Sequence, residues 1–167
     1  RVAMISGASR GIGLAIAREL QQAGLALSLG IRRPGEFTDP LAAGDEVLIH
    51  PYDAHDRGAA APWVDATIAR FGRIDVLVNN AGAGGNFSRV GDVMRDHREN
   101  FSAVLAANFL GPWEAIVAAR EILRTQSGGG SIVNFSTHFF YNASPISAIY
   151  TVSKILLKAL AKAARAD

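Results

Sequence analysis

The sequence predicts an α/β fold, a doubly wound parallel sheet with helices on both faces. Short apolar runs typical of buried strands alternate with segments that carry apolar residues at helical spacing, along the whole chain. Parallel strands need long crossover connections, so this alternation favours a parallel sheet over an antiparallel one. A glycine-rich turn also lies between the first strand and the first helix, where sheets of this kind bind ligands.

The composition is that of a globular protein. The chain has 167 residues, of which 49% are hydrophobic and 19% charged, enough for one well-buried core. It lacks cysteine, which excludes disulfides and thiolate metal sites; we predict no bound metal, and a cytoplasmic location is the default. No run approaches the ~20 apolar residues of a membrane span, so no membrane partner is expected. The net charge of +2 and the scattered basic residues argue against nucleic-acid binding, which the pI near 9.3 keeps only as an alternative.

The first predicted strand and helix flank the glycine turn. Residues 2–5 form an apolar run typical of a buried strand, and residues 14–20 carry apolar side chains at helical spacing. Between them lies the sequence SGASRGIG, residues 6–13. A strand that enters a helix through glycines brings together unpaired N–H groups and the positive end of a helix dipole. We therefore predict a phosphate-binding turn; for these residues alone, a glycine turn without a ligand is the alternative.

The glycines near the first helix have expected roles. Gly7 would permit the tight turn, Gly11 would let the backbone approach a ligand, and Gly13 would let the helix pack closely on the strand. Gly24 stands where the C-terminal cap of this helix is expected.

The end of the second strand bears on the choice of cofactor. Residues 25–31 predict this strand, and the turn Arg32-Arg33-Pro34-Gly35 follows it. In a dinucleotide-binding unit an acidic residue here accepts from the ribose 2′-hydroxyl, whereas an arginine pairs with a 2′-phosphate. Arg32 occupies this place and Arg10 adds a second cation, so the pattern favours NADP(H) over NAD(H). The alternative is that Arg32 and Arg33 are solvated turn residues.

The third strand, residues 47–50, follows a segment that its prolines limit to a short helix. Asp53 and Ala54 come after the carboxyl end of this strand. Asp53 would accept a hydrogen bond from an adenine amino group or, as the alternative, cap the helix that starts near Asp56.

The fourth strand, residues 74–78, follows a predicted alanine-rich helix at residues 58–71 in which Trp63 is a packing residue. The strand runs into Asn79-Asn80-Ala81-Gly82. We expect the asparagines to tie adjacent strands together and the small residues to let a flat ligand approach the backbone.

A long helical pattern covers residues 97–124, with a bend or break expected near Gly111-Pro112. Asn108 lies within it, and an isolated helical asparagine is more often exposed or bonded locally than functional. The fifth strand, residues 132–135, follows this helix and ends in Ser136-Thr137.

Tyr150 and Lys154 lie four residues apart at the start of the last predicted helix and therefore share a face. A phenol is a poor base at neutral pH, but a nearby ammonium group and an oxidised nicotinamide favour the phenolate, which could exchange a proton with a hydroxyl or carbonyl oxygen. This spacing alone is common on solvated helices. The carboxyl ends of parallel strands, however, meet at one edge of the sheet. We therefore expect the following residues to gather there: residues 7–13, Arg32, Asp53, Asn80, Thr137 and Tyr150.

Together these motifs resemble the short-chain dehydrogenase/reductase family, in its subgroup with the S/T-G-x-x-x-G-I-G turn. They come in the family's order and at close to its spacings over the entire chain: residues 6–13, Asp53, residues 79–82, Asn108, residues 130–137, and Tyr150 with Lys154. The resemblance implies a Rossmann-like fold and an oxidoreductase that moves a hydride between a nicotinamide cofactor, here NADP(H), and a small carbonyl or alcohol substrate.

The resemblance also implies a role for each site residue. Tyr150 would be the acid/base, Lys154 would bind the nicotinamide ribose and favour the phenolate, and Asn108 would hold a water in the proton relay. The family's substrate-binding serine falls on Thr137, which keeps the hydroxyl but adds a methyl group; Ser136 ranks second. The residues expected to hold the cofactor are Gly7, Ser9, Arg10, Gly11, Ile12, Gly13, Arg32, Asp53, Ala54, Asn80, Ala81, Gly82, Tyr150 and Lys154.

The chain departs from the family pattern at Thr137 and in its length. Members usually continue well beyond the Tyr–Lys helix, so we expect residues 1–167 to be a single dinucleotide-binding domain that is incomplete at its C-terminus. The threonine leaves a cofactor-binding protein with impaired or no turnover as the alternative function. The family's two long helices usually pack against a second copy, so the resemblance implies a homo-oligomer, a dimer or a tetramer.

Overall fold

The parallel sheet has the strand order β3-β2-β1-β4-β5. The computed structural model describes residues 1–85, 89, 98–138 and 147–166, and within these residues the sheet has five strands, all parallel. The strands are β1 (Val2–Ser6), β2 (Ala26–Ile31), β3 (Val47–Pro51), β4 (Val76–Asn79) and β5 (Ser131–Asn134). The order reverses direction at β1, between β2 and β4, and in such sheets this is the point where ligands bind. The predicted Rossmann-like fold is confirmed.

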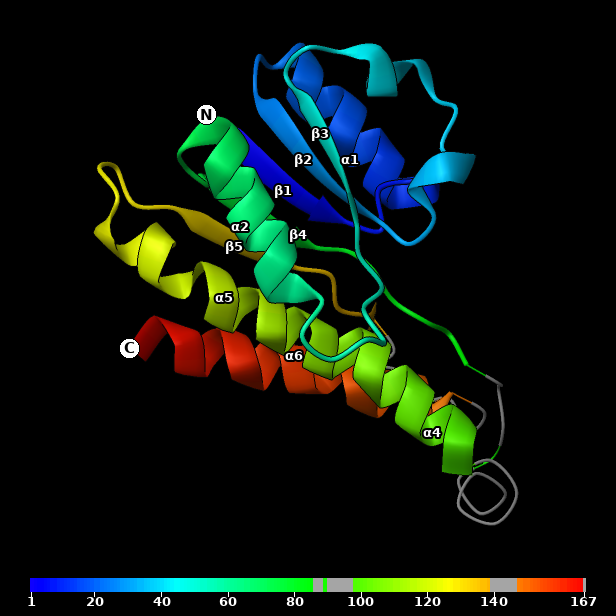
Figure 1. Ribbon diagram of the computed structural model, residues 1–167. Helices are drawn as coiled ribbons and strands as arrows, with labels where there is room; N and C mark the ends of the chain where they lie inside the picture. The colour runs from blue at the N-terminus through cyan, green and yellow to red at the C-terminus, as the bar shows by residue number, and fades with distance from the viewer. Residues whose placement is uncertain (86–88, 90–97, 139–146, 167) are drawn as a thin grey trace.

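Helices cover both faces of the sheet (Figure 1). Helix α1 and two short 3₁₀ turns pack on one face, whereas α2 and α5 pack on the other, and α6 runs alongside the α4–α5 region. The helical elements are α1 (Gly11–Gln22), α2 (Ala60–Phe71), α4 (Arg98–Leu105), α5 (Gly111–Thr125), α6 (Ala148–Ala166), a π-helical turn (Ala106–Leu110) and the 3₁₀ turns Pro34–Glu36 and Pro40–Ala43. The boundaries lie close to those predicted from sequence.

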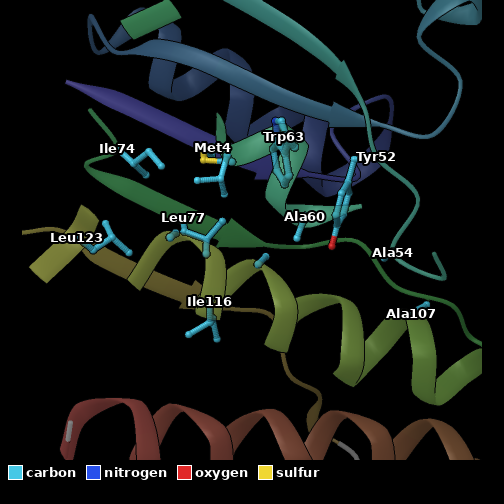
Figure 2. Packing of buried hydrophobic residues seen from close by; sticks show 13 residues of the cluster. Met4, Tyr52, Ala54, Ala60, Trp63, Ile74, Leu77, Ala107, Ile116 and Leu123 are labelled. Atoms are coloured by element: carbon cyan, nitrogen blue, oxygen red, sulfur yellow. The ribbon is translucent and has the colours of Figure 1, made fainter. Parts of the chain in front are cut away.

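Alternation along the strands divides the core into two layers. In β1, Ala3 and Ile5 face α1, while Met4 faces α2 and α5, because successive side chains of a strand point to opposite faces. Figure 2 shows Met4 of the sheet beside Trp63 of α2, and Leu77 of β4 on the side of the sheet that α5 covers. The central strands β1 and β2 are buried on both sides because both of their faces are covered, whereas in β5 Val133 remains 43% exposed.

Trp63 anchors α2 on the sheet. Its ring is fully buried, its indole N–H donates to Ser28 Oγ (2.9 Å), and it lies over Gly30, where a Cβ would come within 2.8 Å of the ring. The ring of Tyr52, just beyond β3, packs against it with 4.7 Å between centroids. The packing role predicted for Trp63 is confirmed, and this packing also holds the chain that follows β3.

The expected break in the long helix is confirmed as a π-helical turn. Residues Ala106–Leu110 form this turn directly before Gly111, and such turns are frequent at functional sites. Gly111 sits against the chain after β3, because a Cβ there would lie 2.6 Å from the carbonyl oxygen of Ala54. The break therefore brings the helix into contact with the end of β3.

The helical stretch Glu99–Thr125 has 27 residues and contains an 18-residue window of mean hydropathy 1.4, so by length and composition it could cross a membrane. From the sequence, no segment was expected to be apolar enough over the length of a membrane span. Its buried residues Ala115, Ile116 and Ala119 pack in the core layer beneath the sheet. A core helix of this kind passes the same test, so the stretch is weak support for a membrane role.

Candidate functional site

A cleft of about 830 Å³ lies at the carboxyl ends of the strands. Its walls come from the β1–α1 turn, the end of β2, the chain after β3 and the chain after β4. Of the predicted cofactor residues, those that line it are Gly7, Ser9, Arg10, Gly11, Ile12, Arg32, Asp53, Ala54, Asn80, Ala81 and Gly82. The lining also includes residues that the sequence analysis did not select, namely Ile31, Arg33, Glu36, Phe37, Tyr52, His55, Ala83, Gly84 and Ala107.

The glycine turn fits a phosphate group. Gly7 has φ +67° and donates its N–H to the carbonyl of Gly30 (2.9 Å), which turns the chain sharply at the end of β1. A Cβ at Gly13 would overlap the Gly7 carbonyl oxygen, so α1 lies directly against the turn. At Gly11 a Cβ would meet open space, which leaves the N-terminus of α1 accessible from the cleft. An accessible helix N-terminus of this kind suits the pyrophosphate of a dinucleotide.

Hydrogen bonds join the ends of β1 and β4 beneath the cleft. Ser6 Oγ accepts from the N–H groups of Asn80 and Ala81 (3.0 Å each), and Asn80 Nδ2 donates to the carbonyls of Ser6 (3.0 Å) and Gly7 (3.2 Å). Asn79 Nδ2 donates to Asn134 Oδ1 (2.8 Å) and joins β4 to β5. The strand-tying role predicted for the asparagines is confirmed. The part played by Ser6 was missed, although this serine is the first residue of the S/T-G-x-x-x-G-I-G turn and could have been found from that motif.

Basic side chains line the end of the cleft near β2. Arg33 is engaged by Glu36, with Nη1 3.3 Å from Oε1. Within the described residues neither Arg10 nor Arg32 forms an ion pair, and both line the cleft. Both guanidinium groups therefore belong to the cleft wall, and in the described part of the chain no carboxylate lies within ion-pair distance of either.

Asp53 organises the chain between β3 and α2. Its Oδ1 accepts from the backbone N–H of His55 (3.0 Å) and lies 2.7 Å from His55 Nδ1. Burial raises the pKa of Asp53, but the hydrogen bonds from His55 and the charge of Arg32 outweigh it, so the pKa lies below its usual value. The suggestion that Asp53 caps the next helix is wrong, because the cap residue of α2 is Ala59 and Asp53 bonds within its own loop.

Asn108 connects three segments from within the π-helical turn. Its Oδ1 accepts from the N–H of Ala83 (2.7 Å), and its Nδ2 donates to the Ala83 carbonyl (2.9 Å) and to Ser153 Oγ (2.9 Å). The side chain is completely buried. The expectation of an exposed or locally bonded asparagine is therefore wrong. These bonds hold the chain after β4 and helix α6 on the π-helical turn.

Three of the predicted cofactor residues, Gly13, Tyr150 and Lys154, are not among the residues that line the cleft, and Lys154 lies behind Gly82, which does line it. Lys154 is only 4% exposed, and burial lowers its pKa to about 8. A Cβ at Gly82, which lines the cleft, would be 3.1 Å from Lys154 Nζ and 2.8 Å from Asn108 Oδ1. Gly82 therefore leaves the space that the ammonium group and the amide share. Tyr150 lies one turn earlier in α6 and is partly exposed.

The two hydroxyl residues after β5 differ in their surroundings. Ser136 Oγ donates to the backbone carbonyl of Lys154 (3.1 Å), so it joins this segment to α6. Thr137 is partly exposed. His138 is exposed, and the aromatic residues 139–141 that follow it lie outside the described residues.

Comparison with known proteins decides the family. The family model described as short chain dehydrogenase matches residues 1–167, the whole chain. The chain belongs to the short-chain dehydrogenase/reductase family. One relative is the 2-(R)-hydroxypropyl-CoM dehydrogenase of Xanthobacter autotrophicus, which is 37% identical over 172 aligned residues, covering 100% of this chain and 68% of that protein.

Solved structures of short-chain dehydrogenases/reductases superimpose closely on this chain. An alcohol dehydrogenase from the archaeon Thermococcus sibiricus, complexed with 5-hydroxy-NADP, matches with TM-score 0.84 and 32% identity over 98% of this chain and 69% of its own. A short-chain dehydrogenase/reductase from Burkholderia phymatum in complex with NAD matches with TM-score 0.87 and 26% identity over 98% of this chain and 58% of its own. Such structures therefore bind either nicotinamide cofactor.

The chain is shorter than its relatives. It spans 64% of one curated oxidoreductase that it matches and 31% of two others.

We predict that Lys154→Met stabilises the ligand-free protein at pH 7. The folded-state pKa of about 8 lies below the ordinary value of 10.5, so the buried charge costs stability below pH 8. The cost is relieved as the pH rises from about 8 to 10.5, because the folded state then binds fewer protons than the unfolded state. The free energy of unfolding of the variant should exceed that of the wild type by up to about 3 kcal/mol at pH 7, and most of this difference should disappear at pH 10. Urea denaturation at both pH values measures this, and an equal gain at both would contradict a buried ammonium group.

Proposed function

We propose that this chain forms the cofactor-binding and catalytic part of an oxidoreductase that transfers a hydride between NADP(H) and a carbonyl or alcohol substrate. The supporting observation is the burial of Lys154 beside Gly82, a residue that lines the same cleft as the glycine turn. Perturbed pKa values cluster at functional sites, so a buried lysine with a lowered pKa beside the cleft marks a candidate functional residue.

Tyr150 is proposed as the acid/base. It would give a proton to a carbonyl oxygen during reduction or remove one from a hydroxyl during oxidation. Lys154, four residues later on the same face of α6, would favour the phenolate by its charge and hold the nicotinamide ribose by hydrogen bonds. Thr137 would hydrogen-bond the substrate oxygen through its hydroxyl.

Asn108 is proposed as a positioning residue. Both protons of its Nδ2 are donated to protein acceptors, and its Oδ1 accepts from Ala83. The side chain is therefore committed to holding the π-helical turn, the chain after β4 and α6 together. Any contact of this residue with a relay water would have to come mainly from its backbone.

The cofactor would lie along the cleft. Its pyrophosphate would sit on the glycine turn and the N-terminus of α1, its adenine near Asp53 and its nicotinamide near Gly82. Bound NADP(H) would supply the hydride donor or acceptor. We propose NADP(H) over NAD(H) because Arg10 and Arg32 line the adenosine end without an ion pair among the described residues.

The alternative is a protein that binds NADP(H) with impaired or no turnover. The threonine at position 137 favours it, because the extra methyl group restricts the side-chain rotamer at the place where the family's serine contacts substrate.

We predict that Tyr150→Phe separates these two functions. Removing the hydroxyl should lower kcat for carbonyl reduction by about 10²–10⁴-fold, because no other group would supply the proton. NADPH affinity, followed by fluorescence titration, should remain within about threefold. A wild-type protein that binds NADPH but reduces no member of a carbonyl panel would favour the alternative, and unchanged turnover in the variant would exclude Tyr150 as the acid/base.

We predict that Arg32→Ala weakens NADPH binding by about 10–100-fold and leaves NADH within about twofold, because a charge-assisted bond contributes about 1.5–3 kcal/mol. The matched control is Arg124→Ala. That arginine lies in the last turn of α5 and pairs with Glu121, away from the cleft. Titration of each variant with both cofactors gives the ratio of the dissociation constants for NADPH and NADH. An equal loss of affinity for both cofactors would contradict the proposed preference.

We also propose a homo-oligomer that uses the outer face of α5. Leu110, Trp113 and Val117 are exposed at helical spacing, with Trp113 45% and Val117 61% exposed. Apolar side chains in one stripe on a surface mark an interaction site. Helix packing would bury the stripe against the same stripe of a second copy.

We predict that Trp113→Ser combined with Val117→Glu yields a smaller species in analytical ultracentrifugation than the wild type, because a charge would be buried in the interface. Ser127→Glu, a charge at an exposed position beyond the end of α5, is the control and should leave the association unchanged. A wild type that sediments as a monomer would contradict the proposal.

A further inference from the structure

The adenosine end of the cleft depends on the β3–α2 loop, residues 52–59. Tyr52, Asp53, Ala54 and His55 of this loop all line the cleft. Within the loop, Asp53 accepts from the N–H of His55, and its carbonyl accepts from the N–H of Asp56 (3.0 Å). These bonds shape the loop locally, but they do not fix its position relative to the helices beneath the sheet.

The second half of the loop leads into a helix that lacks a cap of its own. The cap residue of α2 is Ala59, and within the described residues α2 has neither a capping side chain nor an acidic residue in its first turn. Glu114 holds the approach to this helix from α5, because its Oε2 accepts from the N–H of Gly58 (2.8 Å), two residues before the first residue of α2.

Glu114 also meets a positive charge of the same loop. The distance from Arg57 Nε to Glu114 Oε1 is 3.7 Å. Arg57 is largely exposed, so this pair alone contributes little, whereas the Glu114 side chain is only 27% exposed. The stronger interaction is the charge-assisted hydrogen bond from Gly58, at the positive end of the α2 dipole.

The same turn of α5 supports the first half of the loop. Gly111 lies so close to Ala54 that a Cβ would be 2.6 Å from the Ala54 carbonyl oxygen and 3.0 Å from its Cβ. The first turn of α5 thus contacts the loop at Ala54, through close packing, and at Gly58, through the Glu114 carboxylate. Burial and then the negative charges of Glu114 and Asp53 raise the pKa of Tyr52, which places Glu114 within electrostatic reach of the cleft wall.

We propose that Glu114 is a positioning residue for the adenosine half of the cofactor, because its carboxylate holds the β3–α2 loop against α5 at Gly58. The inference rests on the proposed binding of NADP(H) in the cleft. Glu114 is not one of the residues that line the cleft, and it acts through the loop. Without the carboxylate, the loop of the free protein samples more conformations. Ordering it when the cofactor binds then costs more conformational entropy and weakens binding.

The test compares Glu114→Ala and Glu114→Gln with the matched control Glu121→Ala in the full-length protein. Glu121 lies on the same helix, but its carboxylate is 66% exposed and pairs with Arg124. The probes are NADPH and adenosine 2′,5′-bisphosphate, whose dissociation constants are measured by titration calorimetry. Steady-state kinetics with a carbonyl substrate give KM for NADPH and kcat separately.

Glu114→Ala should weaken both probes by about tenfold and raise KM for NADPH equally, with kcat at saturating NADPH within twofold. Glu114→Gln keeps an oxygen acceptor for Gly58 but loses the charge, so it should weaken both probes by about threefold. Glu121→Ala should bind as the wild type does. Hydrogen exchange of residues 53–59 should be faster in both Glu114 variants.

The outcomes separate this inference from the proposed function. A wild-type protein that binds neither NADPH nor NADH overturns the proposed function itself. A wild type that binds NADPH, together with a folded Glu114→Ala that binds it equally well, overturns only the role of Glu114, as does a fall in kcat without a change in KM. If Glu114→Ala does not fold, Glu114→Gln decides, and unchanged loop exchange with unchanged affinity overturns the role.

Discussion

The buried amide of Asn108 holds together the parts of the molecule from which the candidate site is built. Its bonds to Ala83 and Ser153 connect the π-helical turn to the chain after β4 and to α6. The ammonium group of Lys154 lies beside this junction, where Gly82 leaves room for it. Burying this amide without its hydrogen-bond partners would cost free energy. The three segments are therefore held in the arrangement that supplies every partner. The depth of Lys154, and with it the lowered pKa, follows from that arrangement.

The opposite end of the cleft depends on close backbone contacts. Gly7 and Gly13 allow β1 and α1 to meet directly, and Ser6 and Asn80 join β1 to β4 immediately below. A parallel sheet gathers the carboxyl ends of its strands at one edge, so residues far apart in sequence line a common cleft. Glycines and short polar side chains are concentrated there because the backbone itself forms the binding surface.

The residues in the first turn of helix α5 face different surroundings. Trp113 is exposed, while the adjacent Glu114 turns to the β3–α2 loop and Gly111 packs against Ala54. The π-helical turn before it sets the rotation of the helix, because one extra residue in a turn shifts every later side chain around the axis. The helix therefore supports the wall of the cleft while it presents an apolar stripe on its outer side.

The sequence by itself determined the order of strands and helices along the chain, the parallel sheet, the glycine turn and the strand-tying asparagines, because each of these follows from local patterns: apolar periodicity, glycine spacing and short polar side chains at strand ends. Only the tertiary structure decided the partners of Asn108, the local role of Asp53 and the hydrogen bond by which Glu114 holds Gly58 of the β3–α2 loop. Each of these depends on which distant backbone group a polar side chain meets, and hydrogen bonds across long sequence separations leave no periodic signal in the chain.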